Sequence, residues 1–193
     1  MPGNQSSIDP EYFVALYRHN DDPWNFAGSG YEAAKYATTI AALPAARYGS
    51  AFEIGCSIGI LTAMLAKRCD ALLAVDVSDR ALELARLRCS TSSHVRFAAM
   101  AVPKQFPSDT FDLIVLSEVG YFWSRPDLAL ARDRMIAALR PQGIVLLVHW
   151  TPPVSGHPVS ADEVHETFLT DGRLKQLQGR REERYRLDVC QKT

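Results

Sequence analysis

The most constraining feature of this chain is a glycine turn that joins an apolar strand to a helix. Glu53 lies near the end of the predicted strand, and Gly55 and Gly59 bracket the turn that follows. The next apolar stretch, residues 71–75, ends in Asp76. In an open parallel sheet, ligands bind beyond the carboxyl ends of the strands, and a carboxylate on the second strand accepts hydrogen bonds from ribose. The pattern therefore predicts a site that holds a nucleoside.

A dinucleotide fits this turn poorly. The dinucleotide fingerprint G-x-G-x-x-G seats a pyrophosphate on backbone N–H groups at a helix N-terminus. Here residues 56–58 separate the two glycines, and the Glu53 carboxylate would repel a pyrophosphate. A carboxylate in this place suits a cationic ligand, such as the amino group of a methionine tail. A tight turn without a ligand remains the alternative for the glycines alone, but Glu53 and Asp76 together make it the weaker interpretation.

The pattern E-x-G-x-S-x-G, with an acid at the end of the next strand, resembles the S-adenosylmethionine-dependent methyltransferases. Most members of that family have glycine where this chain has Ser57. The resemblance implies that Glu53 binds the cofactor ammonium and that Asp76 accepts from both ribose hydroxyls. The full cofactor site that it implies consists of Glu53, Gly55, Ser57, Gly59, Asp76, Val77, Met100, Ala101, Ser117 and Lys35.

The remaining members of this implied site contact the adenine and the methionine tail. Val77 and Met100 would enclose the adenine, and the Ser117 carbonyl could face the amino group. Many members of the family have an acidic residue after the third strand. This chain has Met100 and Ala101 there, so backbone groups and packing would hold the adenine. Lys35 is a candidate for the cofactor carboxylate, and a solvated lysine on a helix surface is an equally good interpretation.

Further motifs narrow the resemblance to the nodulation protein S type of methyltransferase, over about residues 21–168. They are DDPW at residues 21–24, YE at 31–32 with Lys35, ALP at 42–44, FDLIV at 111–115, SEV at 117–119, YF at 121–122 and GH at 156–157, before a helix with EV at 163–164. Those enzymes N-methylate the free amine of a deacetylated chitooligosaccharide. The resemblance therefore implies an N-methyltransferase that acts on an amino sugar or such an oligosaccharide.

Three residues are candidates for the proton transfer that an amine acceptor requires. Glu118 follows the fourth predicted strand, where the substrate would enter, although it could instead only order the backbone nearby. His149 and His157 flank the loop after the fifth strand, and an imidazole has an unperturbed pKa of about 6.5. His149, His157 and His165 match no compact zinc pattern, so the sequence predicts no metal site.

Three aromatic residues are candidates for binding the acceptor. Tyr121 and Trp123 follow Glu118 in the same loop, and Trp24 lies in the N-terminal part of the chain. Aromatic rings pack on the apolar faces of sugars. Such rings are also common core residues in small proteins, which is the alternative interpretation.

Alternating strand and helix patterns predict an α/β fold. Expected strands lie at residues 52–54, 72–75, 95–98, 111–116 and 144–149, and expected helices at 31–43, 61–68, 78–89, 128–139 and 161–170. This order is typical of a Rossmann-like, doubly wound, mainly parallel seven-stranded sheet. Residues 173–193 are expected to close it as an antiparallel hairpin around Gly179. We expect a single domain over residues 1–193, with a helical extension at 1–46 and the core at 47–193.

The composition limits which partners and which cellular location can be expected for this chain. A formal net charge of −1 offers no basic field for nucleic acid. No stretch approaches the roughly 18 apolar residues of a membrane span, and residues 1–7 lack signal-peptide features. The 4 cysteines are scattered, as is typical of reduced thiols. We therefore expect a cytoplasmic monomer or weak dimer with a small-molecule acceptor and no nucleic acid or membrane partner.

Three alternatives remain open from the sequence. The chain could be a methyltransferase that acts on another small molecule. It could be a nicotinamide-dependent oxidoreductase, which the turn spacing and Glu53 disfavour. It could also be a regulatory domain that binds the cofactor without turnover.

Overall fold

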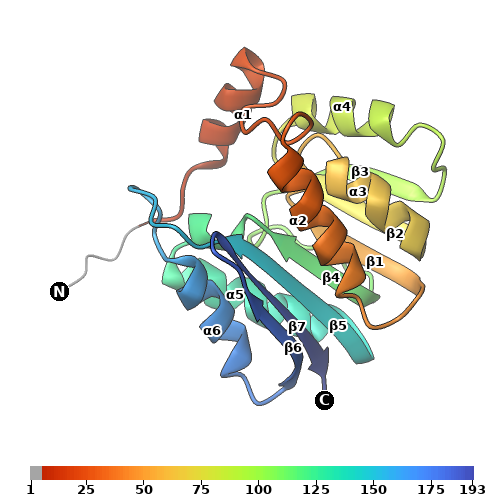
Figure 1. Ribbon diagram of the computed structural model, residues 1–193, viewed down its shortest axis with the longest axis vertical. Helices are drawn as coiled ribbons and strands as arrows, with labels where there is room; N and C mark the ends of the chain where they lie inside the picture. Colours follow the sequence, from red (N-terminus) through yellow and green to blue (C-terminus); the bar gives the residue numbers. More distant parts are fainter. Residues whose placement is uncertain (1–5) are drawn as a thin grey trace. The chain divides into compact units, whose positions relative to one another are not determined.

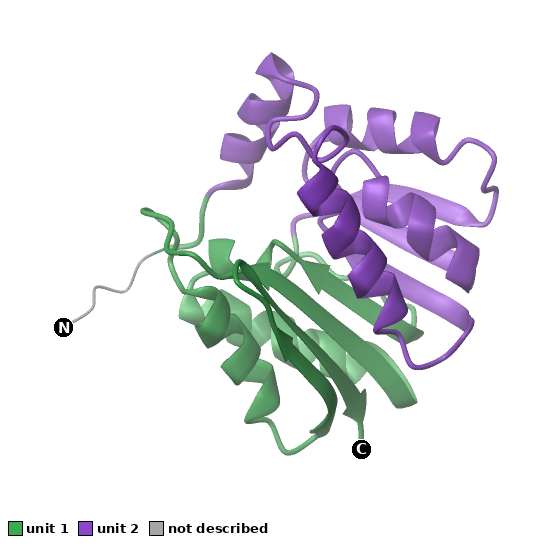
Figure 2. Ribbon diagram, in the orientation of Figure 1, with its two compact units in different colours: residues 1–8, 102–193 green, residues 9–101 purple. Residues whose placement is uncertain are grey.

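A computed structural model describes residues 6–193 of the chain (Figure 1). The chain divides into two compact units, one of Asp9–Ala101 and the other of Met1–Ile8 with Val102–Thr193 (Figure 2). The expected absence of a signal peptide concerns a segment whose first five residues lie outside the described part. The single-domain organisation of residues 1–193 stays a prediction.

The unit of residues 9–101, purple in Figure 2, is a three-stranded parallel sheet with helices. Its elements are α1 Pro10–His19, α2 Gly30–Ala41, β1 Tyr48–Ile54, α3 Ile60–Leu65 with a 3-10 turn at Ala66–Arg68, β2 Cys69–Asp76, α4 Asp79–Arg88 and β3 Val95–Ala99. The strand order is β3-β2-β1, and helix α3 contacts both α2 and α4 (Figure 1). The carboxyl ends of these strands therefore meet at one edge, where the glycine turn leaves β1.

Local sequence signals explain where these helices begin. Asp9, Ser29 and Ser78 are N-caps whose side chains accept hydrogen bonds from backbone N–H groups of the first turn. Pro10 follows Asp9 at the first helical position, where its missing N–H costs nothing. The cap at Ser78 starts α4 directly after Asp76 and Val77, which fixes the loop beyond β2.

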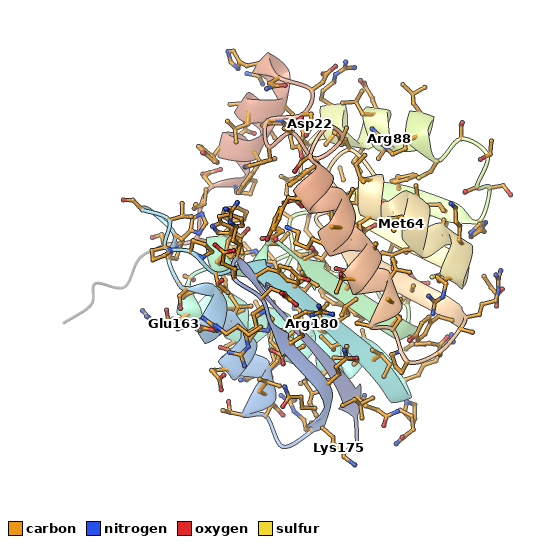
Figure 3. All side chains as sticks on the ribbon, viewed as in Figure 1. Asp22, Met64, Arg88, Glu163, Lys175 and Arg180 are labelled. Atoms are coloured by element: carbon orange, nitrogen blue, oxygen red, sulfur yellow. The ribbon has the colours of Figure 1, made fainter. Side chains whose placement is uncertain are left out.

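The other unit, green in Figure 2, contains the remaining strands. Its elements are β4 Phe111–Ser117, a 3-10 turn at Gly120–Phe122, α5 Arg125–Ala138, β5 Leu139–Trp150, α6 Ala161–Leu169, β6 Leu174–Arg181 and β7 Tyr185–Lys192. Strands β4 and β5 are parallel, whereas β7 is antiparallel to both β5 and β6, in the order β4-β5-β7-β6. A capping box between Ser160 and Glu163 starts α6 (Glu163 is labelled in Figure 3).

The predicted Rossmann-like α/β fold is confirmed. Parallel strands precede an antiparallel C-terminal hairpin, and the two units together supply seven strands. The predicted helices and strands are all present. Their ends differ from the expected ends by a few residues at most, except in β5 and in the hairpin.

The hairpin turn does not lie around Gly179, as the sequence predicted. Gly179 is within β6, paired with Asp188, and the chain turns after Arg181 instead. A Cβ atom at Gly179 would lie 2.6 Å from Gln176 Nε2 and 2.8 Å from Asp188 Oδ1. The glycine therefore serves close packing inside the strand rather than a turn.

Strand β5 also begins earlier than the sequence predicted. Leu139 already pairs with Phe111, and the register shifts before Ile144 pairs with Leu113. Residues 141–143 lie in the irregularity between these pairs, where Gln142 has a φ of 63°. A bulge inserts extra residues into one strand of a ladder without ending it.

Candidate functional site

The glycine turn after β1 has a backbone that few residues adopt. Gly55, Ser57 and Gly59 all have positive φ, at 74°, 51° and 79°. The backbone N–H groups of Gly55 and Cys56 both donate to Val75 O, at 2.8 and 2.9 Å. A Cβ atom at Gly59 would lie 2.9 Å from Ala85 Cα, so only glycine fits beside α4. The turn therefore packs tightly between β2 and α4.

Arg88 holds the same turn from the end of α4 (labelled in Figure 3). Its Nε donates to Ile58 O at 2.9 Å, across a large gap in sequence. The sequence analysis did not find this residue, because an arginine in the last turn of a helix is usual.

Glu53 is a buried carboxylate beside this turn. It is the penultimate residue of β1 and is almost fully buried. Burial raises the pKa of Glu53 to about 8, against an opposing effect of the nearby Thr62 hydroxyl, and the Asp76 charge adds a smaller rise. Within the described residues, its Oε2 atom has no hydrogen-bond partner. A buried carboxylate oxygen without a partner is costly, and a cation placed against it would satisfy it.

Asp76 orders the loops around it. Its Oδ2 accepts from Ser57 N–H at 2.9 Å, and its Oδ1 accepts from Ser78 N–H at 3.0 Å. Burial raises the pKa of Asp76, although these N–H groups oppose the shift. A carboxylate oxygen can accept two hydrogen bonds, so each Asp76 oxygen keeps acceptor capacity for a ribose hydroxyl.

The residues expected around the adenine follow the ends of β2 and β3. Met100 N–H donates to Asp76 O at 3.0 Å, which brings Met100 and Ala101 next to the end of β2. Val77, Met100 and Ala101 are each partly buried. The structure therefore brings Asp76, Val77 and Met100 together, as the sequence predicted for strands of one parallel sheet.

Helix α1 packs on the glycine turn after β1. Tyr17 of α1 is buried against Ile58 and Ala81, and its hydroxyl shares a 2.5 Å hydrogen bond with Ser57 Oγ. Trp24 contacts the Tyr17 ring edge-to-face, with centroids 5.6 Å apart, and is itself 40% exposed. Tyr17 was not among the candidate residues, because nothing in the local sequence shows that a helical tyrosine contacts Ser57.

Lys35 is buried instead of lying on a helix surface. It is 2% exposed, and its Nζ lies 2.9 Å from Glu32 Oε2 on the same helix. It also lies over the rings of Tyr31 and Tyr36, at 5.7 and 5.9 Å from their centroids. The solvated lysine that the sequence left open is therefore wrong, and the cofactor contact stays a prediction.

Glu118 has its carboxylate held at the end of β4, in the other unit. Ser117 ends the strand opposite Val148, and Glu118 follows with a φ of 59°. Glu118 Oε2 accepts from Tyr121 O–H at 2.5 Å and from Trp150 N–H at 2.9 Å. The carboxylate thus orders its own loop, and the positive φ of a non-glycine residue marks a backbone constraint.

His157 packs on this loop. Its ring stacks on Tyr121, with centroids 4.5 Å apart, and meets Phe122 edge-to-face. Burial lowers the pKa of His157 below its ordinary value, against the opposing Glu118 charge. A neutral imidazole has an unprotonated nitrogen that can accept a proton.

His149 and Trp123 differ from the sequence expectation. His149 is fully buried, and both of its ring nitrogens contact protein groups: Gly120 N at 3.1 Å and His165 Nε2 at 3.0 Å. Trp123 is also buried. These surroundings suit structural support better than direct contact with an acceptor.

Residues near the N-terminus brace the same loop, which the sequence did not indicate. Ile8 N–H donates to Phe122 O at 2.8 Å. Ser7 Oγ donates to Asp127 Oδ2 at 2.5 Å and accepts from Ser124 N–H at 2.8 Å.

Among residues 6–193, no three or more His, Cys, Asp or Glu side chains lie together in a way that could hold a metal ion. No helix in this part of the chain combines the length and the apolar character needed to cross a membrane.

Comparison with known proteins places the chain. The family model of Nodulation protein S (NodS) matches residues 15–182. Nodulation protein S of Bradyrhizobium diazoefficiens is 38% identical over 105 residues, which are 53% of this chain and 49% of that protein. The chain spans about half the length of the curated relatives that it matches.

Solved structures agree with that placement. A Pseudomonas syringae protein, described provisionally as a methyltransferase, is 38% identical with a TM-score of 0.76, over 85% of this chain and 100% of that one. The N-methyltransferase NodS of Bradyrhizobium japonicum WM9, solved with S-adenosylhomocysteine, has a TM-score of 0.85 at 24% identity, over 96% and 99% of the chains. The resemblance seen in the sequence motifs is confirmed: the chain belongs to the nodulation protein S (NodS) family and has the Rossmann-like fold of methyltransferases.

Proposed function

We propose that this chain is an S-adenosylmethionine-dependent N-methyltransferase, which acts on the free amine of an amino sugar or a deacetylated chitooligosaccharide. Family membership supports the reaction class. The name of the B. japonicum relative supports methylation of nitrogen, and the acceptor comes from the motif resemblance. The proposal includes the cytoplasmic location, with which four buried free thiols are compatible.

The observation that carries the cofactor assignment is the unpaired Oε2 atom of Glu53. An ammonium group at this carboxylate would satisfy the atom and return Glu53 to its charged form. A pyrophosphate in the same place would meet a buried acid. The residues present therefore fit a cofactor with a cationic methionine tail better than a dinucleotide.

The chain's own residues would then bind and orient the reactants. When bound, S-adenosylmethionine supplies an electrophilic methyl group on a positively charged sulfur. Glu53 would hold the ammonium, Asp76 the ribose hydroxyls, and Val77 and Met100 the adenine. Lys35 is the proposed contact of the cofactor carboxylate, and the Ser117 carbonyl is the proposed contact of the cofactor amino group. Such binding contributes orientation, which is most of what an activated donor requires.

Proton removal from the acceptor amine is assigned to Glu118 and His157. An amine attacks only through a free lone pair, so its ammonium form must first lose a proton. Glu118 would bind the ammonium form, and the neutral His157 ring can accept the proton. Tyr121 fixes both, because it donates to Glu118 and stacks on His157. Trp24 is proposed as an exposed aromatic contact for a sugar ring.

A ligand experiment tests the cofactor. Calorimetry and thermal shift with S-adenosylhomocysteine should show binding and a raised melting temperature, whereas NAD should leave the chain unchanged. Stabilisation by NAD alone would favour the oxidoreductase alternative and contradict the proposal.

An acceptor screen tests the reaction. Labelled S-adenosylmethionine is offered with deacetylated chitooligosaccharides and with their fully acetylated forms. An acetylated nitrogen has its lone pair delocalised into the carbonyl, so label should pass only to the deacetylated sugars. Label on hydroxyl or carbon acceptors would overturn the amine assignment and leave methyl transfer standing. Cofactor binding without transfer to any acceptor would favour the non-catalytic alternative.

A further inference from the structure

A series of buried polar side chains contacts the loop of residues 118–122, which carries Glu118. Gly120 N–H donates to His149 Nε2 at 3.1 Å. His149 Nδ1 lies 3.0 Å from His165 Nε2, and His165 Nδ1 lies 2.6 Å from Asp188 Oδ2. His149 and His165 are 0% exposed and Asp188 is 1% exposed. Three separate elements, β5, α6 and β7, thus contribute to one contact path that ends at the loop backbone.

Only one placement of protons satisfies this path. A backbone N–H can only donate, so His149 Nε2 is the unprotonated nitrogen and Nδ1 carries the proton. His149 Nδ1–H then donates to His165 Nε2, and His165 Nδ1–H donates to Asp188. Protonation of either ring would set two N–H groups against each other. Both histidines are therefore neutral in this arrangement. Burial also lowers the pKa of His165, which favours the neutral ring.

The Asp188 end of the path is anchored by further charges. Arg186 Nε donates to Asp188 Oδ2 at 2.8 Å, and Gln176 Nε2 donates to Asp188 Oδ1 at 2.5 Å. Arg186 also pairs with Asp162 at 3.1 Å and Glu166 at 2.9 Å. Arg186 and Gln176 thus hold the Asp188 carboxylate in place, and Arg186 is its counter-charge.

The Gly120 end of the path leads to the proposed acceptor residues. Gly120 begins the 3-10 turn that carries Tyr121, and a Cβ atom there would lie 2.6 Å from Val164 Cγ1 and 3.0 Å from His149 Nε2. Tyr121 in turn donates to Glu118. A shift of the Gly120 backbone would therefore move Tyr121 and the carboxylate that it holds.

We propose that His165 and Asp188 are positioning residues, which act through His149 to hold residues 118–122 in the conformation that receives the acceptor. The statement that this loop receives the acceptor rests on the proposed function. The statement that His165 and Asp188 position the loop does not depend on that function, so each statement can be tested separately.

Three variants on α6 separate positioning from mere stability. His165→Phe removes the acceptor for His149 Nδ1–H. His165→Gln keeps an amide oxygen that can accept that proton. Phe168→Leu is the matched control, because Phe168 is a fully buried residue of the same helix whose side chain has no group that can donate or accept a hydrogen bond.

Hydrogen exchange is the readout that needs no acceptor. In His165→Phe, exchange at residues 118–122 should accelerate by about tenfold or more, as the loss of a buried hydrogen bond implies. His165→Gln should restore much of the protection, and Phe168→Leu should leave this loop close to the wild type. Equal exchange in His165→Phe and Phe168→Leu would overturn the proposal.

Nitrogen NMR of the imidazole rings tests the path in the unmodified chain. This test can therefore be made even if a variant does not fold. We expect neutral rings with the proton on Nδ1 for both His149 and His165. A proton on Nε2 of His149 would break the contact with Gly120 and overturn the proposal.

Kinetics connects the path to the reaction. His165→Phe should raise the acceptor KM by about tenfold, with an unchanged Kd for S-adenosylhomocysteine. A role in stability alone would lower the apparent kcat at constant KM, which would count against positioning. If the wild type methylates no amine, the proposed function fails, and exchange and NMR still decide the positioning.

Discussion

The Tyr17 hydroxyl and Ser57 Oγ share a hydrogen bond of 2.5 Å, which ties helix α1 to the glycine turn of the proposed cofactor site. Ser57 has a φ of 51°, a region that costs a non-glycine residue about 1 kcal/mol. Its N–H donates to Asp76 and its hydroxyl contacts Tyr17, so two hydrogen bonds offset that cost. The serine that stands where most methyltransferases have glycine thus connects the N-terminal segment to the turn.

Removal of the Tyr17 hydroxyl should loosen this connection. We expect Tyr17→Phe to lower the free energy of unfolding by about 1 kcal/mol and to speed hydrogen exchange along α1. Tyr12→Phe on the same helix is the control, because Tyr12 is 52% exposed. A double-mutant cycle with Ser57→Gly should show coupling of about 1 kcal/mol, and simple additivity would show that the bond contributes nothing.

Glu53 should make the ligand-free chain less stable as the pH rises. Its pKa is about 8 in the fold, against an ordinary value of 4.5, so the folded form holds a proton that the unfolded chain loses. Stability from this group is fully present below pH 4.5 and is lost as the pH rises towards 8. Glu53→Gln avoids that loss and should stabilise the ligand-free chain by about 3 kcal/mol at pH 7.

Urea denaturation at pH 5 and at pH 7 measures this difference. The variant and the wild type should nearly coincide at pH 5 and separate at pH 7. The same variant should bind S-adenosylmethionine more weakly, because a neutral amide cannot pair with its ammonium. A pH-independent difference would show that Glu53 is ionised without a ligand.

The sequence predicted the strand ends well, for a physical reason. Glu53 lies one residue before the end of β1 and Asp76 ends the neighbouring parallel strand, and such strands bring their carboxyl ends to one edge. Apolar runs and turn residues locate those ends without any tertiary information. The same reasoning failed for Gly179, since a glycine in a polar segment indicates a turn and a tight strand contact equally well.

Contacts between distant segments could not be predicted in this way. Tyr17 and Ser57 meet across forty residues, and His165 reaches both His149 and Asp188. No local pattern marks such pairs, because the packing of α1 and α6 decides them. The burial of Lys35 could not be predicted for the same reason. It depends on which segments cover α2, whereas the sequence shows only a lysine in a helix.

Asp76 should matter for the cofactor more than for the turn alone. We expect Asp76→Ala to weaken S-adenosylmethionine binding by about 1–3 kcal/mol, because the ribose hydroxyls lose a charged acceptor. The variant also leaves the N–H groups of Ser57 and Ser78 without their acceptor. Asp76→Asn keeps one oxygen acceptor and should bind with intermediate affinity. Calorimetry measures both.

The exposed carboxylate of Asp79, at the start of α4, offers the matched control. Asp79→Ala removes the same charge nearby without a contact in the turn, so it should leave cofactor affinity almost unchanged. If Asp76→Ala folds and binds as tightly as the wild type, the ribose assignment is wrong.

The last prediction concerns Glu118, whose carboxylate either takes part in proton transfer or only orders its loop. Glu118→Gln keeps the size of the side chain and one oxygen that can accept from Tyr121 or Trp150. If the charge binds the acceptor ammonium and assists its deprotonation, turnover should fall by about 100-fold, in the range of general-acid–base effects. Tyr121→Phe removes the hydroxyl that donates to Glu118 and keeps the charge, so a much smaller fall is expected. Turnover of deacetylated chitooligosaccharides measures both variants, and S-adenosylhomocysteine affinity confirms that each still binds the cofactor. A Glu118→Gln enzyme that keeps most of its rate would assign catalysis to orientation, leaving Glu118 as a support for Tyr121 and the Trp150 backbone.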